Sequence, residues 1–154
     1  MHTVAVLALD DVIAFDLATP VGTFGFAHLP DGRPAYRALV CGAPSVRAEA
    51  FTMRPDWGLD VLAEADTIVL PGRTTMDAPV PAEVVDALRA AAARGTRIAS
   101  ICVGAFVLAA TGLLDGLRAT THWRYAARFR ELFPAVDLDP DVLFVDDGDV
   151  LTSA

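Results

Sequence analysis

The chain has 154 residues, a formal net charge of −8 and 54% hydrophobic residues. This length supports one domain with a substantial core, and the acidic charge disfavours contact with a phosphate backbone. We therefore expect no DNA contact by these residues themselves. The longest apolar stretch, residues 98–114, is interrupted by polar residues and glycines and is too short to cross a bilayer. The sequence therefore predicts no membrane partner.

The two cysteines, Cys41 and Cys102, lie in apolar runs. Their spacing fits neither a disulfide framework nor a zinc site, so we expect no bound metal and no other cofactor. The N-terminal stretch MHTVAVLALDD lacks the basic region of a signal peptide and indicates a first strand. Together these features predict a cytoplasmic protein.

The first third of the chain predicts strands separated by a helix. An almost wholly apolar run at residues 3–9 is typical of a strand covered on both faces. A helix is expected over 15–26, where Pro20 is tolerated if the helix proper begins near it. Residues 36–41 predict a second strand. The alternation at residues 49–53 indicates a short antiparallel excursion.

The middle of the chain continues the alternation of strand and helix. Residues 66–72 predict a buried strand that ends in a Pro-Gly turn. A helix follows over 81–94, with proline in its first turn and glycine after its last residue. Residues 97–101 predict a strand and residues 103–111 a helix.

The last third predicts one amphipathic helix and a group of short strands. Over residues 122–132, Tyr125, Phe129 and Leu132 share one face. Short strands are expected at 136–138, 142–145 and 150–152. The whole pattern predicts an α/β domain, a flavodoxin-like three-layer sandwich with a mostly parallel sheet.

Three features follow strands of this sheet, at the edge where binding sites form in such folds. Asp16 comes after the first strand, Gly72 ends a later one, and Cys102 stands between a strand and a helix. Because the carboxyl ends of parallel strands meet at one edge, we expect these residues to share one pocket.

Cys102 has two interpretations. Unpaired amides and the positive end of the following helix would lower the pKa of its thiol and can form an oxyanion hole, while Gly104 allows close backbone approach. Alternatively, Cys102 is a small buried apolar residue, as most free cysteines are. The local pattern alone does not decide between them.

Longer motifs carry a family resemblance. These are AFDLATPVGTF near the N-terminus, the strand end IVLPG, the stretch ASICVGAFVLAATGLLDG and the segment RATTHW. In order and separation they resemble the ThiJ/PfpI superfamily, which has the class I glutamine amidotransferase-like fold. Within it, the chain is most similar to the N-terminal domains of AraC-type transcriptional regulators of the GlxA kind. The resemblance covers essentially the whole chain and implies a cysteine at a strand-to-helix elbow.

The resemblance implies roles for four residues. Cys102 matches the elbow cysteine, and Asp16 matches the acidic residue whose carboxyl lies against its sulfur. His122 matches a histidine near the elbow, and Gly72 matches a glycine whose amide lines the pocket. Each has a structural alternative: Asp16 can cap a helix, His122 can begin one, and Gly72 can simply permit a turn.

The residue after the cysteine, here Val103, differs between the activities that the resemblance suggests. Protease-like and glyoxalase-like members often carry histidine after the cysteine, and isocyanide hydratases carry threonine there. Valine neither donates nor accepts a side-chain hydrogen bond, so both enzymatic patterns are incomplete. We therefore expect a non-catalytic or weakly active pocket that binds a small molecule through Gly72, Val103, Gly104 and His122.

Two functions remain open. The first is the ligand-sensing and dimerising domain of a GlxA-type regulator, reaching DNA only through a C-terminal domain that residues 1–154 lack. The second is a small hydratase or hydrolase in which Cys102 and Asp16 are catalytic. Arg124 and Arg128 are expected on a solvated or dimer-rim face. The resemblance also implies a missing last helix, so we expect one face of the sheet to be bare and the chain to self-associate.

Overall fold

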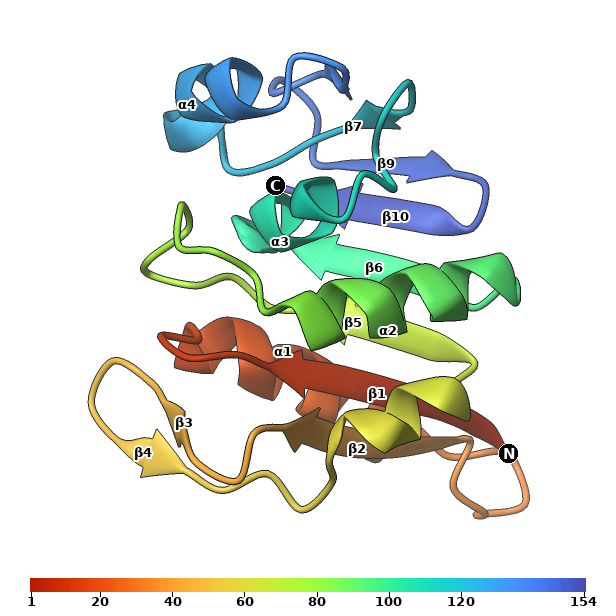
Figure 1. The fold of residues 1–154 in the computed structure, drawn as a ribbon. Helices are drawn as coiled ribbons and strands as arrows, with labels where there is room; N and C mark the ends of the chain where they lie inside the picture. Colours follow the sequence, from red (N-terminus) through yellow and green to blue (C-terminus); the bar gives the residue numbers. More distant parts are fainter.

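The computed structural model describes all residues, 1–154, and is built on a six-stranded sheet (Figure 1). Its strands are β1 (His2–Ala8), β2 (Tyr36–Gly42), β5 (Thr67–Leu70), β6 (Arg97–Ile101), β9 (Phe144–Asp147) and β10 (Val150–Ser153). They lie in the order β2-β1-β5-β6-β10-β9, and only the pairing of β9 with β10 is antiparallel. The predicted mostly parallel α/β sheet is confirmed.

Helices cover both faces of the sheet (Figure 1). One face packs against α1 (Ala14–Gly25), and the other against α2 (Ala82–Ala93) and α3 (Gly104–Ala110). The helix α4 (Ala126–Leu132) lies beyond α3. None of these helices has the length and apolar character needed to cross a membrane. The result is the three-layer arrangement that the sequence predicts.

Smaller elements join these layers. They are the two-stranded sheets β3 (Val46–Arg47) with β4 (Thr52–Met53) and β7 (Arg118–Ala119) with β8 (Asp137–Leu138), and the 3₁₀ helices η1 (Leu59–Ala63) and η2 (Trp123–Tyr125). The antiparallel β3–β4 pair is the short excursion expected near residues 49–53, although it is split by a turn.

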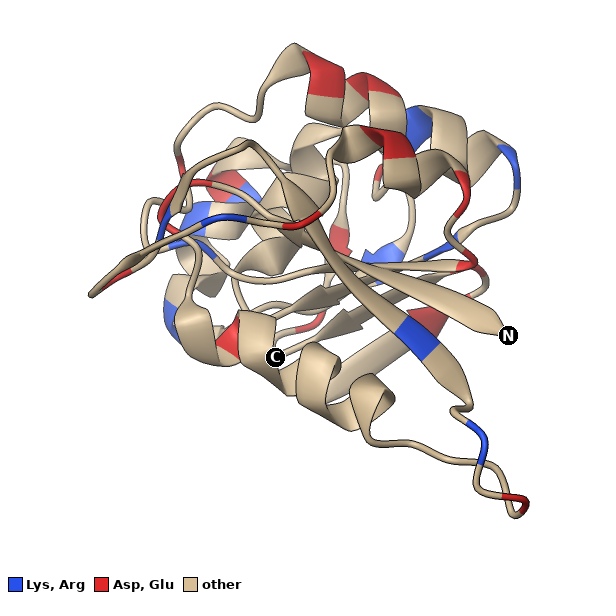
Figure 2. Cartoon of the chain, turned by 90° about the horizontal axis from the view of Figure 1, so that it is seen from below, with Lys and Arg blue, Asp and Glu red and all other residues tan.

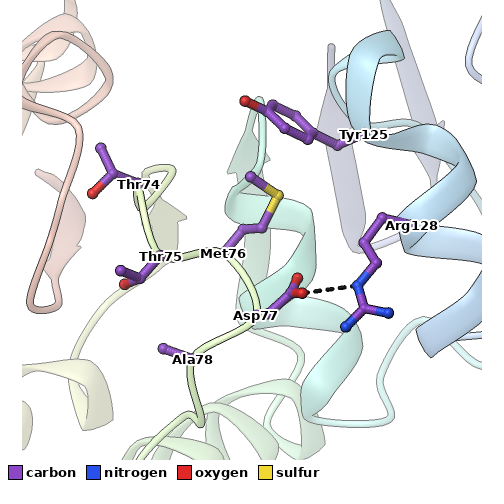
Figure 3. Close-up of a pocket in the computed structure, with 7 residues that line it drawn as sticks. All are labelled: Thr74, Thr75, Met76, Asp77, Ala78, Tyr125 and Arg128. Carbon is purple, nitrogen blue, oxygen red and sulfur yellow. Dashed lines mark hydrogen bonds and ion pairs between the residues drawn. The ribbon is translucent and has the colours of Figure 1, made fainter.

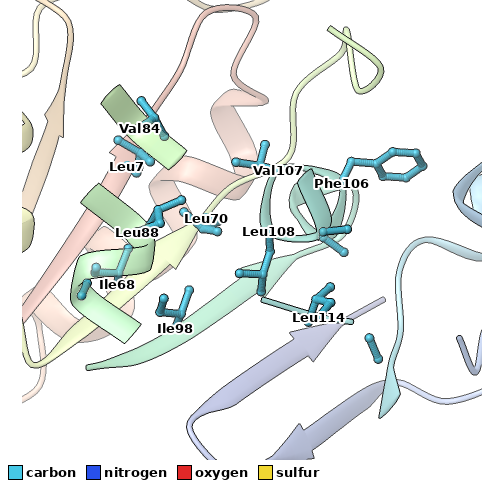
Figure 4. Packing of buried hydrophobic residues seen from close by; sticks show 14 of the residues in the cluster. Leu7, Ile68, Leu70, Val84, Leu88, Ile98, Phe106, Val107, Leu108 and Leu114 are labelled. Carbon is cyan, nitrogen blue, oxygen red and sulfur yellow. The ribbon is translucent and has the colours of Figure 1, made fainter. Parts of the chain in front are cut away.

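The larger core lies between the sheet and the helices α2 and α3 (Figure 4). Leu88 of α2 and Leu108 of α3 are fully buried and belong to the same cluster as Ile98 of β6. The rings of Phe106 and Phe129 meet edge to face with centroids 5.0 Å apart, which fixes α4 against α3. The apolar residues of these elements therefore hold β6 and α3 rigidly beside each other.

The opposite face is only partly covered. There α1 packs on β1 and β2, and beside it a groove of about 450 Å³ runs over β5, β6 and β10. Ile101 and Leu151 line this groove and are half-buried. We call this region the uncovered face: it is the part of the sheet lined by Ala99, Ile101 and Leu151.

Three boundaries differ from those predicted. Because α1 begins at Ala14, Pro20 lies inside the helix and not near its start. Residues 122–132 do not form one helix, because Tyr125 ends η2 and α4 follows it. Within α4, Phe129 is buried whereas Leu132 is 38% exposed. The strand expected at residues 142–145 begins instead at Phe144, where the pairing with β10 starts.

Candidate functional site

Cys102 lies between the last residue of β6 and the first residue of α3, with a φ of 56°. A non-glycine residue in this left-handed region costs about 1–2 kcal/mol, so the surrounding structure must hold it there. The Cys102 N–H donates to the carbonyl oxygen of Ser153 over 3.0 Å, and Thr121 Oγ1 donates to the Cys102 carbonyl over 3.0 Å. Two distant segments therefore fix the turn that carries the thiol.

Gly104 allows this turn to pass close to the end of β5. A Cβ atom at Gly104 would collide with the carbonyl oxygen of Leu70. The glycine is thus required by the close approach of two backbones, which was its predicted local role.

Asp16, Gly72 and Val103 pack together beside this turn. Oδ2 of Asp16 accepts a hydrogen bond from the Gly72 N–H over 3.1 Å, and Asp16 is only 8% exposed. A Cβ atom at Gly72 would lie 2.7 Å from this oxygen and 2.8 Å from Cγ2 of Val103. The structure therefore brings three residues singled out by the sequence into one buried cluster.

A pocket of about 280 Å³ opens over Cys102; we call it the cysteine pocket. It is lined by Ile13, Arg73, Thr74, Met76, Cys102, Val103, His122 and Tyr125. Of the predicted residues, Cys102, Val103 and His122 line it, whereas Asp16, Gly72 and Gly104 lie behind its wall. The residues predicted to gather at one edge of the sheet do lie near one another, but they do not all line one pocket.

A second hollow adjoins the cysteine pocket and shares Thr74, Met76 and Tyr125 with it (Figure 3). Asp77 in its loop pairs with Arg128 of α4 over 2.8 Å. This ion pair joins the loop after β5 to α4 on the solvent side of the pocket. Arg128 also contacts Glu131, so it is held on the surface of α4.

The structure does not support the interpretation in which the start of the helix lowers the pKa of the Cys102 thiol. Burial raises the pKa of the Cys102 thiol, and the carboxylate of Asp16 raises it further, while the Val103 N–H lowers it. Burial prevails because it removes water from the thiolate, and one amide does not replace that hydration. The thiol is therefore protonated at neutral pH.

Asp16 is also shifted toward its neutral form. Burial raises the pKa of Asp16, and Glu49 adds to this, while the Gly72 N–H and His122 act in the opposite direction. Nδ1 of His122 accepts from the Arg124 N–H over 3.2 Å, which makes Nε2 the protonated nitrogen of the neutral ring. The site thus presents a thiol, a carboxyl whose pKa is raised and an imidazole N–H.

Sequence reasoning missed two residues of this region. Thr121 holds the Cys102 carbonyl, and its place in the TTHW segment was the available signal. Arg73 lines the cysteine pocket and directly follows Gly72, but an arginine after a turn gives no sign that it will be buried. Both depend on contacts between segments far apart in the chain.

Comparisons with known proteins agree with this fold. The chain is 29% identical over 148 residues to the HTH-type transcriptional regulator GbdR of Pseudomonas aeruginosa, covering 94% of this chain and 40% of GbdR. It is 47% identical over 66 residues to the regulator GlxA of Rhizobium meliloti, covering 42% of this chain and 20% of GlxA. It is 31% identical over 137 residues to the isonitrile hydratase of Pseudomonas putida, covering 87% of this chain and 56% of the hydratase. The chain therefore spans less than half the length of both regulators.

A solved structure shows the same architecture. The AraC family transcriptional regulator from Pseudomonas putida superposes with a TM-score of 0.77 at 21% identity, over 100% of this chain and 84% of that one. The family model described as DJ-1/PfpI matches residues 2–154. This family match, which spans nearly the whole chain, shows that the chain belongs to the DJ-1/PfpI family.

Proposed function

We propose that the chain is the ligand-sensing and dimerising domain of an AraC-type regulator of the GlxA kind. In this proposal residues 1–154 bind a small nitrogen-containing metabolite in the cysteine pocket and contact no DNA themselves. DNA is reached through a separate domain, as the helix-turn-helix regulators among its relatives suggest. The dimeric state and a cytoplasmic location are part of the same proposal.

One observation carries this choice: the thiol of Cys102 has a raised pKa and no side-chain partner on the residue that follows it. A nucleophilic cysteine needs a neighbouring base or a lowered pKa. Val103 offers only its amide N–H and an apolar side chain packed against Gly72. A pocket with a protonated thiol, an imidazole N–H and apolar walls suits recognition better than turnover.

Purified protein tests the proposal against two probes, cyclohexyl isocyanide and methylglyoxal. We expect no steady turnover of either compound, and no difference between the wild type and Cys102→Ala. Thermal shifts with a set of amines and amino acids should reveal a ligand that stabilises the wild type and not His122→Ala, because His122 lines the pocket. Steady turnover abolished by Cys102→Ala would overturn the sensor as the primary function.

A hydratase is the second candidate, favoured by the similarity to isonitrile hydratase and by the carboxyl of Asp16 behind the cysteine. Cys102 Sγ would bond to the isonitrile carbon while its proton, relayed by Asp16, moves to that carbon, giving a thioimidate. Water would then add to the same carbon, and the C–S bond would break to return the thiol and release a formamide. No oxidant is needed.

Val103→Thr distinguishes the two candidates. Threonine supplies the polar neighbour that the hydratase pattern requires, and its shape is close to that of valine. If the site is a hydratase weakened at one position, Val103→Thr gains isocyanide turnover that Cys102→Ala removes. Absence of activity in both the wild type and Val103→Thr counts against the hydratase.

A further inference from the structure

Arg73 is the one arginine that is buried, with 6% of its surface exposed. Its Nε donates to the carbonyl oxygen of Asp10 over 2.9 Å, and its Nη1 donates to that of Ala78 over 3.3 Å. No carboxylate lies within ion-pair distance, since the five ion pairs of the structure involve other arginines. Buried guanidinium groups are normally paired, so this one lacks an anionic partner.

The unused nitrogen of Arg73 opens onto accessible space. Nη2 donates to no protein atom. Among side-chain nitrogen and oxygen atoms that are fully buried, only Oγ of Ser100 lacks a hydrogen-bond partner, so Nη2 is not fully buried. Nη2 therefore retains accessible surface although the side chain as a whole is buried. Burial lowers the pKa of Arg73, while the carboxylates of Asp11 and Asp10 raise it from beyond contact distance.

A cavity of about 530 Å³ lies where this side chain is held. It is formed at the carboxyl ends of β1 and β2 against the first turn of α2, and Arg73 lines it together with Leu59, Glu83 and Val84. Asp10, whose carbonyl accepts from Nε, lines it as well. Of the residues around this cavity, only Arg73 also lines the cysteine pocket, so the two pockets are neighbours on either side of this side chain.

We propose that this cavity binds a small aliphatic monocarboxylate, one of whose oxygens accepts from Nη2 of Arg73. A guanidinium suits a carboxylate in shape and charge, and the volume is in the range of small-molecule sites. The apolar part of the ligand lies against Leu59 and Val84.

The rim of the cavity narrows the ligand class. The exposed side chains of Asp10 and Glu83 add negative charge around the single buried cation, and Figure 2 shows acidic residues in the first half of α2 and a basic residue farther along it. These carboxylates repel a dianion such as phosphate more strongly than a monocarboxylate, which carries a single negative charge to the guanidinium of Arg73. The site therefore selects among anions by their charge, and it differs in this respect from a phosphate-binding site.

Titration of the full chain with isovalerate, followed by amide NMR spectra at constant ionic strength, tests the proposal. The signals of Gly42, Ala43 and Glu83 should shift to saturation, while Cys102 and Val103 stay in place. Isovaleramide, which has the same shape without the charge, should bind at least tenfold more weakly, and so should inorganic phosphate. Equal binding of acid and amide, stronger binding of phosphate, or no saturable shift overturns the proposal.

Two variants test the residues. Arg73→Met should weaken isovalerate binding at least tenfold, but it also removes two hydrogen bonds that hold the loop after β5. Ala43→Phe avoids that difficulty because Ala43 lines the cavity from an exposed position, and it should block binding by filling the mouth. Unchanged affinity in Ala43→Phe overturns the proposal. Cys102→Ala should bind isovalerate as the wild type does, so this site stands or falls independently of the cysteine pocket.

Discussion

Gly72 donates its backbone N–H to Oδ2 of Asp16 over 3.1 Å, joining residues that are 56 positions apart in the chain. This bond fixes the carboxyl behind Cys102, and the same carboxyl raises the pKa of the Cys102 thiol. Figure 2 shows α1 almost free of charge apart from Asp16, so this carboxyl acts on the site without a neighbouring cation on its helix. The ionisations of Asp16 and Cys102 are therefore linked electrostatically, and the hydrogen bond from Gly72 holds the carboxyl in the position from which it acts.

Asp16→Asn should make Cys102 more reactive toward iodoacetamide near neutral pH. Removing the negative charge lowers the pKa of the thiol, so the alkylation profile should move to lower pH. Asp115→Asn, on an exposed turn, is the matched control and should leave the profile unchanged. Burial raises the pKa of Cys41 to about 12, so mass spectrometry should find only Cys102 modified in the folded protein. A profile that does not move in Asp16→Asn contradicts the linkage.

The same carboxyl should make stability depend on pH. Because the folded-state pKa of Asp16 is raised, the folded chain holds this proton more tightly than the unfolded chain. Its contribution to stability is therefore greatest below the unfolded value, near 3.8, and falls as pH rises through the higher folded value. Asp16→Asn should melt at a higher temperature than the wild type at pH 7, and the difference should shrink toward pH 4. If the difference in melting temperature between Asp16→Asn and the wild type grew on acidification, the pKa of Asp16 would be lowered by folding and the prediction would be wrong.

Cys102→Gly should be more stable than Cys102→Ala by about 1 kcal/mol, the reverse of the usual order of these residues. Both variants lose the sulfur, but only glycine adopts a φ of 56° without strain. Urea unfolding of the two variants measures the difference directly. Equal stabilities would mean that position 102 relaxes out of the left-handed region once the sulfur is gone.

Two glycine substitutions should act in opposite directions. Gly104→Ala should cost at least about 2 kcal/mol, because the new methyl meets the Leu70 carbonyl oxygen. Gly22→Ala should stabilise by up to about 1 kcal/mol, since Gly22 is inside α1 with no atom within 4 Å of the added Cβ. Chemical denaturation compares both with the wild type, and a tolerated Gly104→Ala would show that α3 can shift away from β5.

The uncovered face should drive self-association of the isolated chain. Phe144 pairs with Ser153 across the sheet, so it lies on the same face as Leu151 and is 63% exposed. Light scattering should find dimers or larger species for the wild type, and Phe144→Ser should lower the average mass. Leu143→Ser, an equally apolar and exposed position outside the strand, is the matched control. A monodisperse wild-type monomer refutes this prediction.

The sequence predicted those features that a local pattern of apolar residues, glycine and proline determines. Strand β6 spans Arg97–Ile101 as predicted, and β5 is the buried strand expected before the Pro-Gly turn, since its apolar residues are covered on both faces of the sheet. The sequence placed Asp16, Gly72 and Cys102 at one edge of the sheet because each follows the carboxyl end of a predicted parallel strand.

The remaining features depend on long-range packing. The split of residues 122–132 into η2 and α4 and the burial of Arg73 both follow from contacts that no local pattern encodes. The sequence left the direction of the pKa shift at Cys102 open for the same reason, because the burial of the thiol depends on how α1, β6 and α3 meet. The start of a helix lowers the pKa of a nearby thiol, but the depth to which the thiol is buried decides whether its pKa is raised or lowered overall.

The hydrogen bond from the Cys102 N–H to Ser153 also sets an order of events during synthesis. The thiol turn is complete only when β10 has docked beside β6, and β10 is made about fifty residues after the cysteine. The complete set of hydrogen bonds at the Cys102 turn therefore requires a sheet that has been assembled through β10.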